Sequence, residues 1–289
     1  MKPPLFEYFA PKDVHEAVAM RHAQGEDARY IAGGQSLVPM LNLRVAAPSA
    51  LIDLNGVPQL SEMGRLADRR FAVGAMVRTR RLETDPEVAA ANPLLARAAA
   101  HVAHVQIRNR GTIGGSVAHA DPAAELPAVV LACDAEIETC GPEGARTIAA
   151  IGFFEAVFTT ALQDGELITR IVFPEWPAAR RWGFREVSRR EGDFAMVGIA
   201  AWYDTDEAGR IADARIVGIG AGDRPLRLPA GEAALVGETP SRELFEIAAL
   251  EAQRDLQPNS DIHATAEYRR EVGGVLVFRC LVDAMERAA

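Results

Sequence analysis

The sequence predicts an α+β protein of two domains, because its local patterns change from one kind of order to another along the chain. Up to about residue 175, helical and strand patterns alternate; beyond it, three strand patterns follow one another and three helical patterns come after them. The change falls at "FPEWPAA", residues 173–179, where two prolines interrupt regular structure. We therefore expect one domain over residues 1–175 and a second over 176–289.

The first 60 residues carry signals for a capped helix and two short strands. Asp13 can cap a helix, Glu16 follows at the spacing of a capping box, and Gly25 would end that helix. The stretch "ARYI", residues 28–31, leads into two glycines and predicts a short buried strand. A second strand is expected over "SALIDL", residues 49–54.

The next hundred residues alternate between strand and helix patterns. Residues 65–77, "RLADRRFAVGAMV", alternate as half of a hairpin would. Residues 87–105 are alanine-rich and helical, with a break at Pro93. Residues 123–140 change from helix to strand, and residues 165–177, "GELITRIVFPEWP", form a strand that prolines stop.

The second half is dominated by an antiparallel sheet. Residues 181–228 contain three successive strand patterns, with a hairpin turn at "DTDEAGR", residues 204–210. Helices are expected at 230–236, 241–254 and 264–288. The predicted second domain is thus a three-stranded antiparallel sheet with helices.

Charge and hydropathy exclude several classes of function. The net charge of −9 argues against a nucleic-acid-binding protein, which needs a basic face. No apolar run approaches the roughly 18 residues needed to span a bilayer, and the stretch "MKPPLFEYFAPKD" has no signal-peptide pattern. We expect a cytoplasmic protein without a transmembrane segment.

The cysteines and histidines do not predict a metal site. The cysteines form no CxxC motif, are odd in number, and are most simply small apolar residues; they are Cys133, Cys140 and Cys280. His101 and His104 are three residues apart on an expected helix, but neither they nor His119 come with a third ligand. We expect no metal and no iron–sulfur cluster in this chain.

Two glycine-rich segments are the strongest functional signal. These are "AGGQS", residues 32–36, and "TIGGS", residues 112–116, which we expect at strand ends. Glycines allow successive N–H groups to converge into an anion-binding concavity, and Ser36, Thr112 and Ser116 add hydroxyl groups. Each glycine pair alone is most simply a tight turn, but two such segments favour a shared ligand, a pyrophosphate.

The common nucleotide-binding motifs are absent. The chain has no GxxxxGK[ST] motif, and its two lysines, Lys2 and Lys12, lie far from both glycine segments in the sequence. "GIGAGD", residues 218–223, lacks the last glycine of a dinucleotide fingerprint at the right spacing, so it is better interpreted as a strand end.

Three long stretches resemble a known family. "IAGGQSLVPMLNLR", "HVQIRNRGTIGGSVAHADPAAELPAVVLA" and "SRREGDFAMVGIAA" resemble, in this order, the FAD-binding medium subunit of the molybdenum hydroxylases, the family of carbon monoxide dehydrogenase and xanthine dehydrogenase. The resemblance implies that residues 1–175 form a two-lobed FAD-binding domain of the vanillyl-alcohol-oxidase type, with lobes of about 1–56 and 57–175. Residues 176–289 would be the C-terminal α+β domain of the flavoprotein subunit.

The resemblance also implies which residues hold the FAD. One side of the diphosphate would be wrapped by Ala32, Gly33, Gly34, Gln35 and Ser36, and the other by Thr112, Ile113, Gly114, Gly115 and Ser116. Glu125 stands where the family has an acid, usually Asp, that binds the adenosine sugar hydroxyls; its alternative is a solvated acid at a helix start.

Four further residues are placed near the flavin ring by the resemblance. Ile168 would pack on the ring through its backbone, although an ordinary core strand residue is an equal alternative. Arg185 stands where relatives commonly carry Lys and would hold negative charge on the reduced flavin. Asp193 and Phe194 match a segment close to the ring, where Phe194 could stack.

No catalytic side-chain arrangement stands out, so the flavin would supply the chemistry. The resemblance implies an electron-transfer subunit: electrons would come from a large molybdopterin subunit through a small [2Fe–2S] subunit to FAD, and leave to an external acceptor. The complex would be a dimer of heterotrimers. Two alternatives are a free-standing flavin oxidase of related fold and a non-catalytic nucleotide-binding scaffold.

Overall fold

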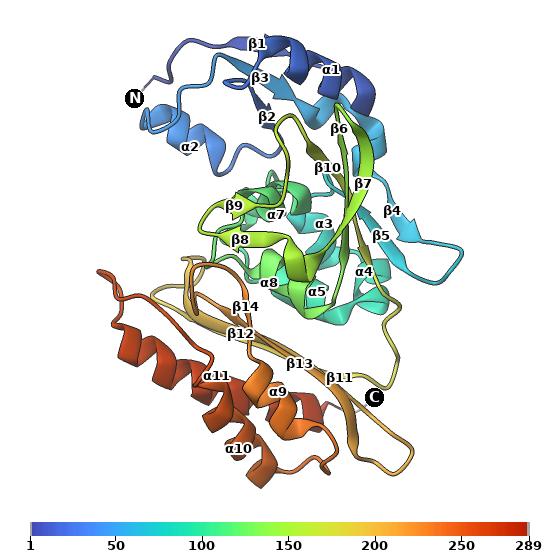
Figure 1. Ribbon diagram of the computed structural model, residues 1–289, viewed down its shortest axis with the longest axis vertical. Coiled ribbons are helices and arrows are strands. Elements are labelled where there is room, and N and C mark those ends of the chain that lie inside the picture. The colour runs from blue at the N-terminus through green and yellow to red at the C-terminus, as the bar shows by residue number, and fades with distance from the viewer. Residues whose placement is uncertain (1, 288–289) are drawn as a thin grey trace.

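A small parallel sheet forms the N-terminal part of the computed structural model, which describes residues 2–287 (Figure 1). Its strand order is β1-β3-β2, and the strands are β1 (Glu7–Phe9), β2 (Arg29–Ile31) and β3 (Ala50–Asp53). Helix α1 (Val14–Gln24) connects β1 to β2, and helix α2 (Leu37–Asn42) follows β2. Both strand predictions are confirmed, but β2 is half-exposed and not buried, since it lies at the edge of the sheet.

The start of α1 follows its sequence signal. The Asp13 carboxylate accepts a hydrogen bond from the N–H of Glu16 at 2.8 Å, and Gly25 ends the helix at φ 78°. The Glu16 carboxylate accepts from the N–H of Lys12 at 2.6 Å, one residue before the position that a capping box would give. The helix boundaries are therefore set locally, as predicted.

A five-stranded antiparallel sheet forms the middle of the molecule, in the order β4-β5-β10-β6-β7. Its strands are β4 (Met63–Arg65), β5 (Phe71–Gly74), β6 (Glu136–Gly141), β7 (Gly144–Ala149) and β10 (Leu167–Phe173). A two-stranded hairpin, β8 (Phe154–Ala156) and β9 (Thr159–Thr160), lies apart from it. Residues 65–77 thus contain the end of β4 as well as β5, so the predicted half-hairpin includes its partner strand.

Helices and short 3₁₀ turns accompany this sheet. They are α3 (Thr79–Thr84), α4 (Pro86–Ala91), α5 (Pro93–Ala99), α6 (Val105–Arg108), α7 (Ile113–His119) and α8 (Glu125–Ala132), with 3₁₀ turns at Leu54–Gly56, Pro58–Ser61 and Ala150–Gly152. The predicted break at Pro93 is confirmed: Asn92 caps α5 by accepting from the N–H of Leu95. Helix α5 ends at Ala99, earlier than the predicted residue 105.

The C-terminal sheet has four antiparallel strands, so the expectation of three was wrong. The order is β11-β12-β13-β14, with β11 (Arg181–Ser188), β12 (Ala195–Thr205), β13 (Ile211–Ile219) and β14 (Leu226–Arg227). The fourth strand is only two residues long and pairs with β13, which leaves little local pattern to detect. "GIGAGD" lies at the end of β13, as predicted.

Helices α9 (Pro229–Leu235), α10 (Arg242–Ala252) and α11 (Ala266–Glu286) cover one face of this sheet, as Figure 1 shows. Residue 288, the last residue of the predicted third helix, lies outside the described part. The opposite face packs on the middle region, because Phe184, Trp202 and Val217 belong to the same core cluster as residues of α5 and α8. The indole N–H of Trp202 donates to the Ala132 carbonyl at 2.6 Å, which ties the sheet to the end of α8.

Candidate functional site

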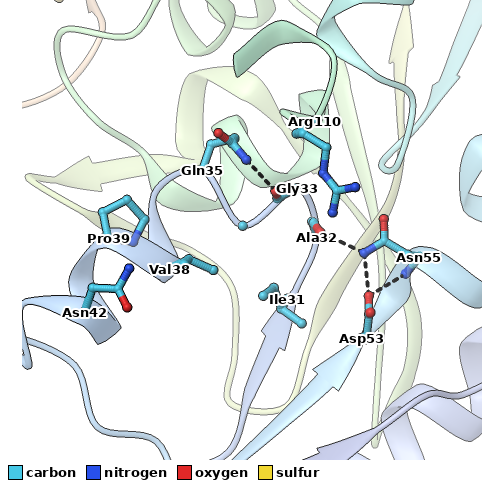
Figure 2. Close-up of a pocket in the computed structure, with 11 residues that line it drawn as sticks. Ile31, Ala32, Gly33, Gln35, Val38, Pro39, Asn42, Asp53, Asn55 and Arg110 are labelled. Atoms are coloured by element: carbon cyan, nitrogen blue, oxygen red, sulfur yellow. Dashed lines mark hydrogen bonds between the residues drawn. The ribbon is translucent and has the colours of Figure 1, made fainter. Parts of the chain in front are cut away.

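The first glycine segment lines a cavity of about 320 Å³ (Figure 2). The segment joins the end of β2 to the start of α2, so it lies at the carboxyl edge of the parallel sheet. The cavity is lined by Ala32, Gly33, Gly34 and Gln35 together with Ile31, Val38, Pro39, Asn42, Asp53, Asn55 and Arg110. Ligands commonly bind at this edge of parallel sheets.

Four consecutive backbone N–H groups of this segment are available to a ligand. Within residues 2–287, no carbonyl or side chain accepts a hydrogen bond from the N–H groups of Gly33, Gly34, Gln35 or Ser36. The Gln35 side chain folds back onto the segment, where its amide donates to the Gly33 carbonyl at 3.0 Å. Backbone N–H groups that are partly shielded from water and lack partners are suited to bind an anion.

The two glycine segments meet, as the hypothesis of a shared ligand requires. A Cβ on Gly33 would overlap the Arg110 carbonyl oxygen and lie 2.9 Å from the Gly111 Cα, so only glycine permits this approach. On the second segment, a Cβ on Gly115 would lie 3.5 Å from the Ala32 side chain. Backbone from residues 32–33 therefore packs directly against backbone from residues 110–115.

The second glycine segment is the start of a helix and not a loop at a strand end, which corrects our expectation. Thr112 caps α7, and its hydroxyl accepts from the N–H of Gly115 at 3.2 Å. The N–H groups of Ile113 and Gly114 donate to the carbonyls of Val77 and Ala75, at 3.1 and 2.9 Å, and the N–H of Ser116 donates to the carbonyl of Thr112. Four N–H groups of this segment thus have partners within the protein.

Gly114 is needed for packing. It is buried, and a Cβ on it would overlap the Ala75 side chain and lie 2.7 Å from the Ala75 carbonyl oxygen. Because glycine has no side chain, α7 can lie directly on the backbone that follows β5. This role is independent of any bound phosphate.

Asp53 is an ionised carboxylate on the cavity wall, at the end of β3. Burial alone would raise its pKa, but hydrogen bonds from the Tyr8 hydroxyl and from the backbone and side-chain N–H groups of Asn55, together with the charge of Arg110, hold its pKa below the ordinary value. The Asn55 amide also donates to the Ala32 carbonyl at 3.0 Å, which links Asp53 to the glycine segment (Figure 2).

Two arginines add positive charge beside this carboxylate. Figure 2 shows the Arg110 side chain extending toward Ala32 and Asn55, and it forms no ion pair within the described part of the chain. Arg78 donates to the Asn55 side-chain oxygen at 2.5 Å and to the Arg110 carbonyl. Burial and the nearby Arg110 lower the pKa of Arg78.

Sequence reasoning missed Asn42, Asp53, Asn55 and Arg110. Asp53 and Asn55 could have been found, because polar residues directly after a buried strand lie at the binding edge of a parallel sheet. Arg110 stands two residues before Thr112 and its cationic side chain was also visible in the sequence. Asn42 comes into the cavity only through the turn of α2, which carries no sequence signal.

Glu125 lies outside the cavity lining, at the start of α8. Its side chain is 4% exposed, so the alternative of a solvated acid was wrong. Burial and the nearby carboxylate of Glu186 raise the pKa of Glu125 to about 8. The Glu186 carboxylate is also buried; one oxygen lies 3.3 Å from His101 Nδ1 and the other has no hydrogen-bond partner within the described residues.

The four residues predicted near the flavin ring also lie outside this cavity. Ile168 is a buried core residue on β10, beside an irregularity in its pairing with β6. Arg185 forms a two-bonded ion pair with Asp283 of α11, at 2.7 and 2.8 Å. Asp193 and Phe194 lie in the turn between β11 and β12, where the Phe194 side chain is 66% exposed.

The described part of the chain offers neither a metal-binding cluster nor a membrane-spanning helix. Within residues 2–287, no cluster of three or more His, Cys, Asp or Glu side chains could hold a metal ion. In the same residues, none of the helices combines the length and the apolar character needed to cross a membrane.

Comparison with known proteins identifies the family. Residues 4–176 match the family described as the FAD binding domain in molybdopterin dehydrogenase, and residues 182–284 match the CO dehydrogenase flavoprotein C-terminal domain. The chain therefore belongs to the FAD-binding medium subunits of the molybdenum hydroxylases. It is an FAD-binding subunit of an oxidoreductase complex.

Relatives of known function support this membership over the full length. The chain is 42% identical to the 6-hydroxypseudooxynicotine dehydrogenase complex subunit alpha of Paenarthrobacter nicotinovorans, over 100% of this chain and 97% of the relative. It is 37% identical to the carbon monoxide dehydrogenase medium chain of Hydrogenophaga pseudoflava, over 100% of both.

Solved structures agree in fold. Carbon monoxide dehydrogenase from Hydrogenophaga pseudoflava matches with a TM-score of 0.96 at 39% identity, and the match covers 100% of both chains. Quinoline 2-oxidoreductase from Pseudomonas putida 86 matches with a TM-score of 0.92 at 38% identity over 98% of both chains.

Proposed function

We propose that the cavity beside the first glycine segment binds the diphosphate of FAD. The observation that carries this proposal is the set of four consecutive N–H groups, from Gly33 to Ser36, that have no partner within the described residues. Gly33, Gly34 and Gln35 line the cavity together with Arg110, whereas Ser36 lies just outside its lining. A doubly charged diphosphate needs several hydrogen-bond donors and a positive charge. The N–H groups of the first glycine segment and the Arg110 side chain supply both. The cavity fits part of the cofactor, and the remainder would extend beyond it.

The second segment supports this site in two ways. The backbone just before it, at Arg110 and Gly111, contacts Gly33 and so fixes the position of the first segment. Its remaining donors toward a ligand would be the Ser116 hydroxyl and the Arg110 side chain, because the N–H groups of residues 113–116 bond within the protein. The proposed roles of Thr112, Ile113, Gly114 and Gly115 are therefore mainly to shape the site.

Asp53 and Asn55 would add specificity for a nucleotide. Asp53 is kept ionised by its partners, so it can accept hydrogen bonds from sugar hydroxyls, a role that the resemblance gave to Glu125. Glu125 remains a prediction for the adenosine sugar, and four residues remain predictions for the flavin end: Ile168, Arg185, Asp193 and Phe194. Among them, Phe194 has the exposed ring that stacking on a ligand requires.

When bound, FAD supplies redox chemistry that joins one-electron carriers to a two-electron acceptor. The chain's own residues bind and orient the FAD, and their N–H groups replace water as hydrogen-bond donors to the diphosphate. We infer that electrons arrive from a small [2Fe–2S] subunit, which takes them from a large molybdopterin subunit, and that the complex is a dimer of heterotrimers. The names of the relatives, which are subunits and medium chains, support this division of labour.

We further propose the domain division at 175/176, a two-lobed FAD-binding domain of the vanillyl-alcohol-oxidase type and a cytoplasmic location. The division is supported by the two family matches, because the first ends at residue 176 and the second begins at residue 182. The cytoplasmic location is supported by three buried cysteines that form no disulfide.

Arg110→Met tests the diphosphate assignment. A hydrogen bond to a charged partner contributes about 1.5–3 kcal/mol, so the Kd for FAD should rise roughly 10- to 150-fold, as measured by quenching of flavin fluorescence. Arg65→Met is the matched control, because Arg65 is exposed and does not line the cavity. Equal FAD affinity of the two variants would contradict the assignment.

A further inference from the structure

A second cavity, of about 500 Å³, opens along strand β11 at the edge of the C-terminal sheet. One wall comes from α5, with Arg97, and the opposite wall from α11, with Arg279. Residues 184–187 of β11 lie between these walls. We call this cavity the β11 groove.

The β11 groove leaves one side of a strand without a partner. β11 is eight residues long and pairs with β12 on one side. No strand among residues 2–287 pairs with its other side. An open edge of this kind presents backbone N–H and C=O groups that can receive a strand from another chain.

Arginines outnumber carboxylates in the groove lining, by four to three, although the chain as a whole has a net charge of −9. Three of these charged residues have ion-pair partners: Arg185 pairs with Asp283, and Glu286 pairs with Arg242 at 2.8 Å. The Glu186 carboxylate lies 3.3 Å from Nδ1 of His101, which also lines the groove. Within the described part of the chain, by contrast, the guanidinium groups of three lining arginines lie within 4 Å of no carboxylate; these are Arg97, Arg279 and Arg287.

Arg287 shows most directly that a partner group is missing. Its Nε is buried and has no hydrogen-bond partner within the described residues. Burial lowers the pKa of Arg287; among the nearby charges Asp283 opposes this effect, and Arg97 and Arg185 add to it. A carboxylate placed here could accept the hydrogen bond that the Arg287 Nε lacks.

These features favour an acidic, extended polypeptide over two other occupants. A second copy of this chain, joined edge to edge, would bring two sets of arginines together and would be repelled. A small anion would neutralise a guanidinium but would leave the backbone groups of β11 unpaired. An extended acidic segment satisfies the backbone and the charge together.

We propose that the open edge of β11 receives an acidic extended segment of a partner subunit as a fifth strand, with carboxylates against Arg97, Arg279 and Arg287. Val187 gives the groove a partly exposed apolar position that can contact a side chain of the added strand. This inference rests on the proposed function in one respect, the existence of a complex with partner subunits.

Hydrogen–deuterium exchange tests the inference directly. The amides of residues 181–188 are followed in the isolated chain and in the complex purified from its native host through a tag on this chain. The expected result is exchange that is about tenfold slower or more in the complex, because strand addition closes the open edge. Unchanged exchange in an intact complex would overturn the inference and leave the proposed function standing.

Charge reversal provides the second test. Arg97→Glu combined with Arg279→Glu should reduce the yield of complex about tenfold or more, while the FAD content of each chain stays the same. The matched control is Arg210→Glu combined with Arg254→Glu, which makes the same charge change at exposed arginines outside the groove. Equal loss of complex in both double variants would overturn the role of the groove.

The remaining outcomes are also decisive. Slow exchange that depends on the concentration of the isolated chain would identify a second copy as the occupant and overturn the inference. Protection reproduced by millimolar inorganic phosphate alone would overturn it in favour of a small-anion site. If the wild-type chain binds FAD but purifies without any partner, the proposed assembly fails and this inference fails with it.

Discussion

Replacing Glu125 by Gln should make the stability of the protein less dependent on pH. Burial and Glu186 raise the pKa of Glu125 from its ordinary value of 4.5 to about 8 in the folded state. The unfolded chain releases this proton above about pH 4.5, whereas the folded chain keeps it until about pH 8. The folded state therefore binds more protons in this interval, and its stability falls as the pH rises through it.

The magnitude follows from the difference between the two pKa values. Each unit costs about 1.4 kcal/mol, so the wild type loses almost nothing at pH 4, about 3 kcal/mol at pH 7 and about 4 kcal/mol at pH 8. Gln has nearly the same shape and does not ionise. Glu125→Gln should thus be about 3 kcal/mol more stable than the wild type at pH 7, and nearly equal to it at pH 4.

Urea unfolding at pH 4, 7 and 8, followed by tryptophan fluorescence with FAD in excess, measures this difference. Glu143→Gln is the control, because Glu143 is exposed and its replacement should leave the pH profile unchanged. Parallel stability profiles of Glu125→Gln and the wild type would refute the reasoning. They would mean that Glu125 is ionised in the folded protein.

Three further changes probe packing and redox tuning. Gly114→Ala should cost about 1–3 kcal/mol in urea unfolding, because its Cβ would overlap Ala75; unchanged stability would contradict the close approach. Trp202→Phe should cost about 1–3 kcal/mol, because the buried carbonyl of Ala132 loses its donor, and a smaller effect would show that another donor replaces it. Arg185→Met should lower the flavin reduction potential in a redox titration, and this change, expressed as a free energy, should exceed the loss in FAD binding free energy. An unaltered potential would contradict a position of Arg185 beside the flavin ring.

Controls for these changes are present in the same chain. Gly152→Ala adds a Cβ in open space, so it separates the overlap at Gly114 from the general effect of replacing a glycine. Asp283→Asn removes the carboxylate partner of Arg185 but keeps the guanidinium. It therefore separates an effect of the Arg185 charge from an effect of breaking the ion pair.

The elements that could be predicted from the sequence are those with local signals. The Asp13 cap and the break before Pro93 act within one turn of a helix, so a few neighbouring residues decide them. Strand β14 was missed because two residues are too few to show an alternation of apolar and polar side chains. Only its pairing with β13 makes it a strand. The helical start at Thr112 was missed because the glycines that follow it disfavour a helix. Hydrogen bonds to the Thr112 hydroxyl and to the carbonyls of Val77 and Ala75 overcome that preference.

The site could be predicted only in part for the same reason. Consecutive glycines indicated an anion site at Gly33 and Gly34, because that signal is a property of the backbone itself. Arg110 and Asp53 contribute through contacts between segments that are distant in the sequence. The burial of Glu125 also depends on packing across elements, and an acidic residue at a helix start gives no local sign of it.

The contact between Gly33 and the backbone at Arg110 has a consequence for biogenesis. The segments that form the proposed diphosphate site lie far apart in the sequence. The site therefore exists only once the N-terminal sheet has docked on the middle region. Loading with the yellow cofactor should thus be a late event, after the polypeptide has reached its tertiary structure. Newly made chains would emerge colourless, and cells short of riboflavin should accumulate a folded apoprotein.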